Sequence, residues 1–342
     1  MVFCFQLTPH ANIRYREAQL KLGKAELACI LQGLGLSCDI SSAVIGGVTF
    51  LTFEADALSP AQLSALSRHS AALMICEMQG SAENGTLMLR PLEKVSHAYL
   101  TEDLPEVLKY KGKTSAVFTH MMLNCARAAS SFFADDAPLT VLDPICGRGT
   151  TCFVALQQGM NAVGVDVDRR DLKEAADYFE RHLQFHRLKH KLDQGSRTVR
   201  KHAVPEAVYT IADSKEHFKE GDTRSLALYL GDTGLTGDLM KKQPAHLIVS
   251  DLPYGVQHAP QDGKRTETFM QVMKRALPAW HAALRPGGAI ALSFNVLTLK
   301  KETLAQLLTD AGFTPLCDAP YDDFEHFVET AVTRDFIVAR RS

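Results

Sequence analysis

The sequence of 342 residues has no excess of charge of either sign, no long apolar run and no paired cysteine motif. Its formal net charge of −2 excludes a globally basic surface, so nucleic-acid binding would depend on local clusters of Lys and Arg. No stretch of about 18 apolar residues is present, and the N-terminus MVFCFQLTPH has no basic segment ahead of an apolar core. We therefore expect neither a membrane span nor a signal peptide.

The eight cysteines are scattered among apolar neighbours without a CxxC spacing. This distribution favours free thiols in a reducing compartment over a disulfide framework or a zinc site built from cysteine pairs. We therefore expect a cytoplasmic protein without a bound metal. The hydrophobic fraction of 46% is sufficient for a sizeable core, and the length is natural for two domains.

Residues 140–166, TVLDPICGRGTTCFVALQQGMNAVGVD, have the pattern of a strand, a glycine turn, a helix and a second strand. Both ends of this stretch are short apolar runs, which suit strands buried on both faces of a parallel sheet. Gly147 and Gly149 allow the main chain to turn tightly and to approach a ligand closely. Residues 150–158 predict a helix that ends at a glycine. The stretch therefore predicts a βαβ unit with a ligand-binding turn.

Two acids accompany this turn: Asp143 ends the first strand and Asp166 follows the second. An acid about twenty residues beyond a glycine turn can accept hydrogen bonds from both ribose hydroxyls of an adenosine. Cys152 stands where a dinucleotide-binding turn has its third glycine, which disfavours the alternative of an NAD site. The pattern resembles the S-adenosylmethionine site of class I methyltransferases, in which the turn borders the methionine moiety and the second acid holds the ribose. The residues that this resemblance implies for cofactor binding are Asp143, Cys146, Gly147, Gly149 and Asp166.

A second motif, Asp251-Leu252-Pro253-Tyr254, follows an apolar run at residues 245–250 that predicts another buried strand. The exocyclic amine of a base is a poor nucleophile because its lone pair is delocalised into the ring. The Asp251 carboxylate and the Leu252 carbonyl can accept its two N–H groups and let the nitrogen turn toward a methyl carbon. Pro253 stiffens the turn, and Tyr254 can stack on a flipped base. We expect these four residues to be catalytic, with Asp251 also beside the cofactor; a plain turn is the alternative.

The tetrapeptide resembles the (D/N)PPY signature of amino-methyltransferases, with Leu252 in place of the first proline. The acceptor at this position is a backbone carbonyl, so the replacement changes the rigidity of the loop and keeps the acceptor. Enzymes of this kind often contact the cofactor through a segment ahead of the first strand. The residues that the resemblance implies there are Thr114, Phe118 and Thr119, on or beside a helix predicted at 115–129. A purely core role for Phe118 is the alternative.

A helix is predicted to start near Asp168 and to continue through FERHLQFHRLKHKLDQG, and it overlaps a basic segment at residues 181–202. Such a cluster could neutralise several phosphates, and an exposed solvated face is the alternative. His182, His186 and His190 would share one helix face, but no carboxylate or cysteine at ligand spacing completes a metal site. The expected nucleic-acid contacts are Arg187, Lys189, Lys191, Arg200 and Lys201, together with Lys264 and Arg265 in the polar loop after Tyr254.

The third strand of the sheet is predicted at residues 208–211 or 217–220. In class I methyltransferases an acid after this strand binds the exocyclic amine of the adenine. This implies Asp222 as a cofactor-binding residue, with Asp213 as the rival. A helix N-cap is an alternative role for Asp222.

The N-terminal region has a different pattern, with strands expected at residues 2–7, 36–44, 48–54 and 72–78 and helices at 15–34 and 59–70. The order βαββαβ is that of ferredoxin-like domains. We therefore predict a ferredoxin-like domain at 1–88, a linker at 89–113 and a methyltransferase domain at 114–342. The expected fold is α/β, with a Rossmann-like class I methyltransferase sheet preceded by an α+β ferredoxin-like domain.

Four features together resemble the THUMP-associated tRNA guanosine N2-methyltransferases, including those that modify position 10. They are LDPICGRGTT, DLPYG, the KGKT segment ahead of the first strand, and the expected N-terminal domain. The resemblance implies S-adenosylmethionine as the cofactor, tRNA as the partner and the N2 amine of a guanosine as the methyl acceptor. The alternatives are a DNA adenine-N6 or cytosine-N4 methyltransferase and a non-catalytic RNA-binding relative.

Overall fold

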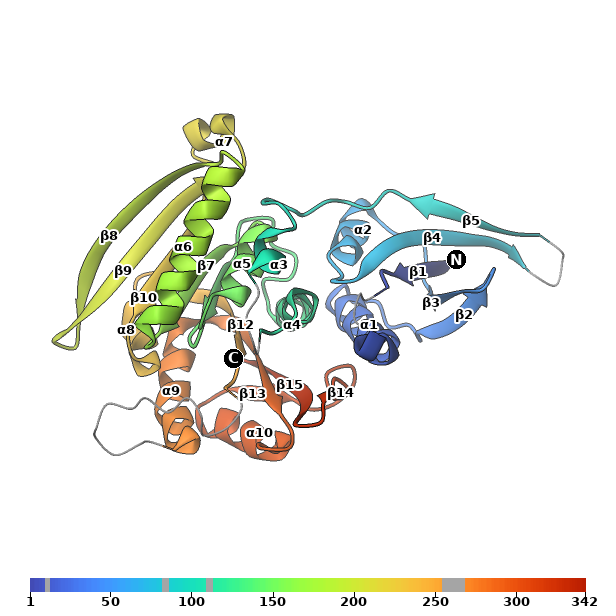
Figure 1. The fold of residues 1–342 in the computed structure, drawn as a ribbon. Helices are drawn as coiled ribbons and strands as arrows, with labels where there is room; N and C mark the ends of the chain where they lie inside the picture. Colours follow the sequence, from blue (N-terminus) through green and yellow to red (C-terminus); the bar gives the residue numbers. More distant parts are fainter. Residues whose placement is uncertain (10–12, 82–85, 109–112, 254–267) are drawn as a thin grey trace.

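The computed structural model describes residues 1–9, 13–81, 86–108, 113–253 and 268–342, which form two β-sheets flanked by helices (Figure 1). Within these ranges no helix is long and apolar enough to cross a bilayer. The smaller sheet contains the N-terminal strands, drawn in blue to cyan, and the larger sheet contains all the later strands of the described residues (Figure 1).

The N-terminal sheet has five strands in the order β2-β3-β1-β4-β5, and each neighbouring pair is antiparallel. Its elements are β1 (Val2–Leu7), α1 (Ile13–Gly33), β2 (Ser41–Ile45), β3 (Val48–Glu54), α2 (Pro60–Ser67), β4 (Ala72–Ser81) and β5 (Thr86–Leu92). The first six follow the predicted order βαββαβ. The fifth strand was not expected, and the predicted linker begins inside it. The ferredoxin-like assignment and the division at residue 88 stay predictions.

The larger sheet has the order β13-β15-β12-β11-β6-β7-β10-β9-β8, with β14 paired to β15. Its strands are β6 (Thr140–Asp143), β7 (Asn161–Asp166), β8 (Lys189–Val199), β9 (His202–Ala212), β10 (Arg224–Leu230), β11 (Ala245–Asp251), β12 (Leu284–Asn295), β13 (Thr314–Leu316), β14 (His326–Glu329) and β15 (Val332–Arg340). The five central strands of the sheet are parallel, and they are β12, β11, β6, β7 and β10. The strands on either side of these five pair antiparallel to their neighbours. This mainly parallel sheet confirms the predicted Rossmann-like α/β fold.

The helices of this part are α3 (Leu104–Val107), α4 (Ala116–Ala129), α5 (Thr150–Gln157), α6 (Arg169–Phe185), α7 (Lys215–Glu220), α8 (Thr236–Leu239), α9 (Phe269–Ala283) and α10 (Lys301–Asp310). Val141 and Leu142, adjacent on β6, belong to two separate apolar clusters. The cluster around Val141 includes residues of α4, α5 and α6, and that around Leu142 includes residues of α9 and α10. Both faces of the parallel strands are therefore covered, which explains their continuous apolar runs.

Two predicted elements between β7 and β10 are wrong. Helix α6 ends at Phe185, and the basic segment beyond it forms the antiparallel hairpin β8–β9 instead of continuing the helix. The third parallel strand is β10, whereas residues 208–211 lie in antiparallel β9 and residues 217–220 in α7. Nearly all of β8 is exposed, so it carries no apolar periodicity that would identify a strand.

The two sheets are joined where α1 packs against α4, between the two parts of the molecule in Figure 1. Glu26 of α1 is fully buried there and accepts hydrogen bonds from the Ser70 N–H at 2.8 Å and from Asn124 Nδ2 at 2.7 Å. Because a buried carboxylate is costly without donors, this network fixes the register of α1 on α4.

Candidate functional site

The glycine turn lies between β6 and α5 and is tied to the tip of β7. The Cys146 N–H donates to the Val165 carbonyl at 3.0 Å, and the Gly147 N–H donates to Asp166 Oδ2 at 2.7 Å. Gly147 has φ of 49° and Gly149, the N-cap of α5, has φ of 82°, conformations that favour glycine. A Cβ on Gly147 would meet no atom within 4 Å, so the turn borders open space that a ligand can fill.

Asp166 is 9% exposed and also accepts a hydrogen bond from the Asp168 N–H, at Oδ1 and 2.8 Å. Burial raises the pKa of this carboxyl, and the two backbone N–H donors oppose that rise. Each carboxylate oxygen keeps a second lone pair after accepting one N–H. The side chain can therefore accept a pair of vicinal hydroxyls, which is the chemistry expected for a ribose.

Asp143 ties the first motif to the second. Its Oδ1 accepts hydrogen bonds from the Ser250 hydroxyl at 2.7 Å and from the Ile145 N–H at 3.2 Å. Ser250 precedes Asp251 on β11, the strand next to β6. The two motifs, about a hundred residues apart in the chain, thus meet at the carboxyl ends of adjacent strands. In an open α/β sheet this edge is where ligands bind.

Burial raises the pKa of Asp143 to about 7, although hydrogen bonds from Ser250, Thr151 and Ile145 lower it. The folded chain therefore binds more protons than the unfolded chain between the ordinary carboxyl pKa and pH 7. The contribution of this group to the free energy of unfolding falls as pH rises through that window. We expect Asp143→Asn to weaken this fall, measured by urea unfolding at pH 5 and pH 8. An unchanged pH dependence in the variant would contradict the assignment.

Asp251 ends β11 with a side chain that is 26% exposed. The hydroxyls of Thr114 and Ser293 donate to its two oxygens, and Arg334 lies 3.9 Å from Oδ2. The Arg334 guanidinium also stacks over the Phe118 ring at 5.2 Å. These groups fix the orientation of the carboxylate from three separate segments, while its partial exposure leaves it accessible to a substrate.

Leu252 is 2% exposed and belongs to the same apolar cluster as Leu142, so its side chain anchors the loop in the core. Its N–H donates to the Ser293 carbonyl at 2.9 Å, which fixes the peptide plane between Asp251 and Leu252. Core packing thus restrains the loop at the position where a proline ring would do so by fixing φ. Pro253 is half-buried. Tyr254, Lys264 and Arg265 lie outside the described residues.

The other predicted cofactor contacts pack into the protein. The Phe118 ring lies edge-on to Phe336 at 5.7 Å, and the Thr119 hydroxyl donates to the Ser115 carbonyl at 3.1 Å. Cys146 is buried beside Cys152, and both sulfurs lie against the position that a side chain on Gly164 would occupy. Of the residues expected ahead of the first strand, Thr114 is the one that the structure brings to Asp251.

The structure does not place Asp222 or its rival Asp213 at the carboxyl edge of the sheet. Asp222 precedes β10 and pairs with Arg224 at 2.6 Å, and Asp213 follows β9 and pairs with His217 at 2.6 Å. Since Arg224 pairs with Ile211 in the sheet, both acids lie at the edge opposite Asp166. These two acids were expected at the carboxyl edge because the third strand was predicted at residues 208–211 or 217–220, whereas it is β10 in the structure.

The acid at the carboxyl end of β10 is Asp232, which was not among the residues predicted from the sequence. The neighbouring Gly231 N–H donates to the Asp166 carbonyl at 2.9 Å, and Arg275 forms two contacts with the Asp232 carboxylate. The apolar run at 226–230 followed by Gly231-Asp232 was the available signal. Asp232 therefore replaces Asp222 as the candidate beside Asp166.

The predicted nucleic-acid contacts fall into two groups at opposite ends of the β8–β9 hairpin. Arg187, Lys189 and Lys191 lie where β8 begins, and Lys191 pairs with Asp193 at 2.8 Å. Arg200 and Lys201 form the hairpin turn. A strand of this length spans roughly 30 Å, so the five residues do not form one cluster. The turn lies on the side of the carboxyl edge, near α8 (Figure 1), where Arg200 pairs with Asp238 at 2.6 Å.

No protein-family model and no curated protein matches the chain. Among solved structures it is similar to a TehB-like SAM-dependent methyltransferase from Corynebacterium glutamicum, with 17% identity over 62% of this chain and 85% of that one and a TM-score of 0.33. It is also similar to TrmN from Thermus thermophilus, with 16% identity over 89% of this chain and a TM-score of 0.38. The chain spans 60% of the length of that TrmN. A third is the T. thermophilus 16S rRNA N2 G1207 methyltransferase RsmC in complex with AdoMet and guanosine, with 14% identity over 94% of this chain and 71% of that one and a TM-score of 0.36.

Proposed function

We propose that the chain is an S-adenosylmethionine-dependent methyltransferase that acts on the exocyclic N2 amine of a guanosine in tRNA. The observation that supports this most strongly is the hydrogen bond between Ser250 and Asp143, which joins the Asp251-Leu252 loop to the strand leading into the glycine turn. A ligand bound along that turn therefore ends beside the two acceptors that an amine needs.

The residues of the carboxyl edge fit the cofactor. Gly147 leaves open space at the turn, and Asp166 keeps lone pairs for two ribose hydroxyls. Asp232 lies next to Asp166 along the same edge and can accept a hydrogen bond from the adenine amine. For this the Arg275 guanidinium has to move away from the Asp232 carboxylate or share it with the adenine. When bound, S-adenosylmethionine would supply an electrophilic methyl group on a sulfonium.

Asp251 and Leu252 then act on the substrate. The carboxylate and the Leu252 carbonyl each accept one N–H of the amine, which localises the lone pair and aims it at the methyl carbon. In the net reaction the nitrogen gains the methyl group and loses one proton, which the Asp251 carboxylate can receive. Thr114 and Ser293 hold that carboxylate in place throughout.

The hairpin turn supports an RNA partner. Arg200 and Lys201 have φ of 47° and 69°, the arrangement of a two-residue turn that normally selects Asn-Gly. Non-glycine residues in this region cost roughly 1–2 kcal/mol each. Both cations are exposed at this tip, where they can contact phosphates, and Arg200 would exchange its pairing with Asp238 for such a contact.

Replacing the turn by Asn-Gly (Arg200→Asn with Lys201→Gly) is expected to raise the free energy of unfolding by about 1 kcal/mol or more. The same change should weaken tRNA binding and lower the slope of log K against log salt by roughly 0.7–0.9 for each phosphate that is no longer neutralised. Fluorescence anisotropy at several salt concentrations measures this. Lys215→Ala with Lys219→Ala, two exposed cations of α7 that are not among the predicted contacts, removes the same charge far from the turn and is the matched control. Equal losses in both double variants would refute a specific role for the turn.

The function is tested by incubating the full chain with labelled S-adenosylmethionine and either total tRNA or duplex DNA, followed by mass spectrometry of the nucleosides. N2-methylguanosine in tRNA supports the proposal. N6-methyladenine or N4-methylcytosine in DNA would replace it by a DNA enzyme, and cofactor binding without any product would identify a non-catalytic relative.

A further inference from the structure

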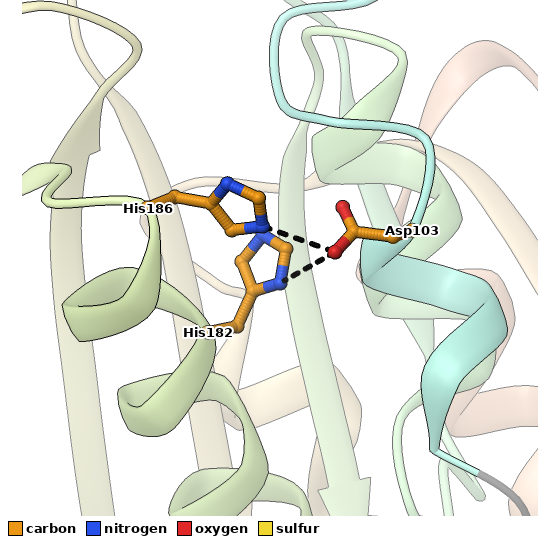
Figure 2. Close-up of side chains that lie close together, drawn as sticks. All are labelled: Asp103, His182 and His186. Carbon is orange, nitrogen blue, oxygen red and sulfur yellow. Dashed lines mark hydrogen bonds and ion pairs between the residues drawn. The ribbon is translucent and has the colours of Figure 1, made fainter.

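A cluster of possible metal ligands lies outside the proposed methyl-transfer site. His182 is in the last turn of α6, His186 caps that helix, and Asp103 is the N-cap residue of α3 in the segment that connects the two sheets. Figure 2 shows both imidazoles directed at the carboxylate of Asp103. No carboxylate was expected beside these histidines, because Asp103 is distant in the chain. His190, the third histidine of the expected row, lies instead on β8.

The geometry is close to that of a three-ligand site. His186 Nε2 lies 3.0 Å and His182 Nδ1 lies 3.9 Å from Asp103 Oδ2, and the three ligand atoms fall within 4.8 Å of one another. A tetrahedral ion with bonds of about 2.0–2.2 Å places its ligands roughly 3.4 Å apart. Modest side-chain shifts would therefore bring all three atoms onto one ion.

Thr101 contacts the nitrogen of His182 that faces away from Asp103. Its hydroxyl oxygen lies 3.3 Å from His182 Nε2 and can accept an Nε2–H, and in that tautomer the lone pair of Nδ1 faces Asp103. This is the arrangement by which a neighbouring group fixes the tautomer of a metal-binding histidine.

The second carboxylate oxygen of Asp103, Oδ1, also bears on the site. Among the described residues, its Oδ1 is buried without a hydrogen-bond partner, while Oδ2 faces the two histidines. An unsatisfied buried carboxylate oxygen is costly, and a cation bound at this carboxylate would offset that cost. A solvent-facing side remains for a water as the fourth ligand, since the Asp103 side chain is 40% exposed.

We propose that Asp103, His182 and His186 bind one divalent transition-metal ion of the zinc type, with a water as the fourth ligand. Two imidazoles and one carboxylate suit zinc and neighbouring first-row metals, whereas magnesium prefers an all-oxygen octahedral shell. Helix α6 starts beside Asp166 and runs away from it, so the site lies roughly 20 Å from Asp166. Its role is therefore structural: it fastens the connecting segment, which leads to Thr114, onto α6.

The test uses the full chain, stripped with a chelator and titrated with zinc chloride in a calorimeter, with metal content measured after desalting. The wild type should retain about one zinc per chain, and zinc should raise its melting temperature. Asp103→Asn and His186→Asn should each weaken zinc binding at least about tenfold. Thr101→Val, which keeps all three ligands, should weaken it to a smaller degree. Magnesium chloride should produce no shift.

The control is His190→Asn, which removes an exposed histidine from the neighbouring strand and should bind zinc like the wild type. Melting in the absence of metal reports whether each variant is folded. A wild type that retains no zinc overturns the proposal, as does an affinity that falls equally in His190→Asn and His186→Asn. Neither readout depends on methyl transfer, so the outcome is independent of the proposed function.

Discussion

Asp251→Asn is expected to slow methyl transfer by about 10²–10³-fold, the usual effect of removing one preorganised polar group from a reacting centre. The amide keeps the shape of the carboxylate, so Thr114 and Ser293 can still form hydrogen bonds by rotating their hydroxyls. It presents an N–H where the substrate amine requires an acceptor, and it cannot receive the proton. The loss should therefore appear in kcat, because the glycine turn and Asp166 are untouched.

Single-turnover rates and calorimetric titration of the cofactor separate these effects. Asp177→Asn is the control, since Asp177 is an exposed acid whose pairing with Lys173 along α6 contributes little to stability. If Asp251→Asn lost cofactor affinity together with the rate, Asp251 would belong to cofactor binding and its role toward the amine would be refuted.

Asp166→Asn is expected to reduce the affinity for S-adenosylmethionine by about 100-fold, since hydrogen bonds to a charged group contribute about 1.5–3 kcal/mol each. The variant also turns an N–H toward either the Gly147 or the Asp168 N–H, both of which donate to the native carboxylate. Calorimetry with the cofactor alone measures the loss. Asp222→Asn, at the opposite edge of the sheet, should leave the affinity unchanged.

A glycine substitution at the turn provides a second test of where the cofactor binds. Gly147→Ala places a methyl group in the open space at the turn, and Gly221→Ala places one in open space at the C-terminus of α7. Both positions have positive φ, so both changes carry a similar conformational cost of roughly 1 kcal/mol. Weaker cofactor binding should appear in Gly147→Ala alone. If both variants bound equally well, the cofactor would not lie against this turn.

The parallel sheet could be predicted because its strands are buried on both faces and leave a strong local signal. The run ahead of Asp143 and the run ahead of Asp251 each end in the residue that their motif requires, and both are strands in the structure. The orientation of the two motifs toward one edge followed from the rule that parallel strands share their carboxyl ends.

The region between β7 and β10 could not be predicted in the same way. Strand β8 is polar on both faces, so alternation of apolar and polar residues is absent, and its Lys and His residues are equally suited to a helix surface. This misassignment placed the third strand in β9 or α7, and with it the acid that was predicted to bind the adenine. The parallel pairing of β10 with β7 is what places Asp232 at the carboxyl edge, near Asp166.

Contacts between residues that are far apart in the chain could not be predicted from the sequence either. Thr114 was expected to touch the cofactor, yet its hydroxyl holds Asp251, and Asp103 meets His182 and His186 although no local spacing links them. Core packing by Leu252 was equally hidden, because a leucine in a loop motif does not show which cluster will receive it.

The β8–β9 hairpin covers the edge that β10 would otherwise present. Without it, β10 would be an outermost strand with a row of free backbone groups and apolar side chains that are buried in the native fold. Such an edge can pair with a strand of another chain and begin aggregation. The sheet ends instead at β8, whose residues are mostly exposed and include lysine, aspartate and arginine, and charged side chains on an outermost strand disfavour such pairing.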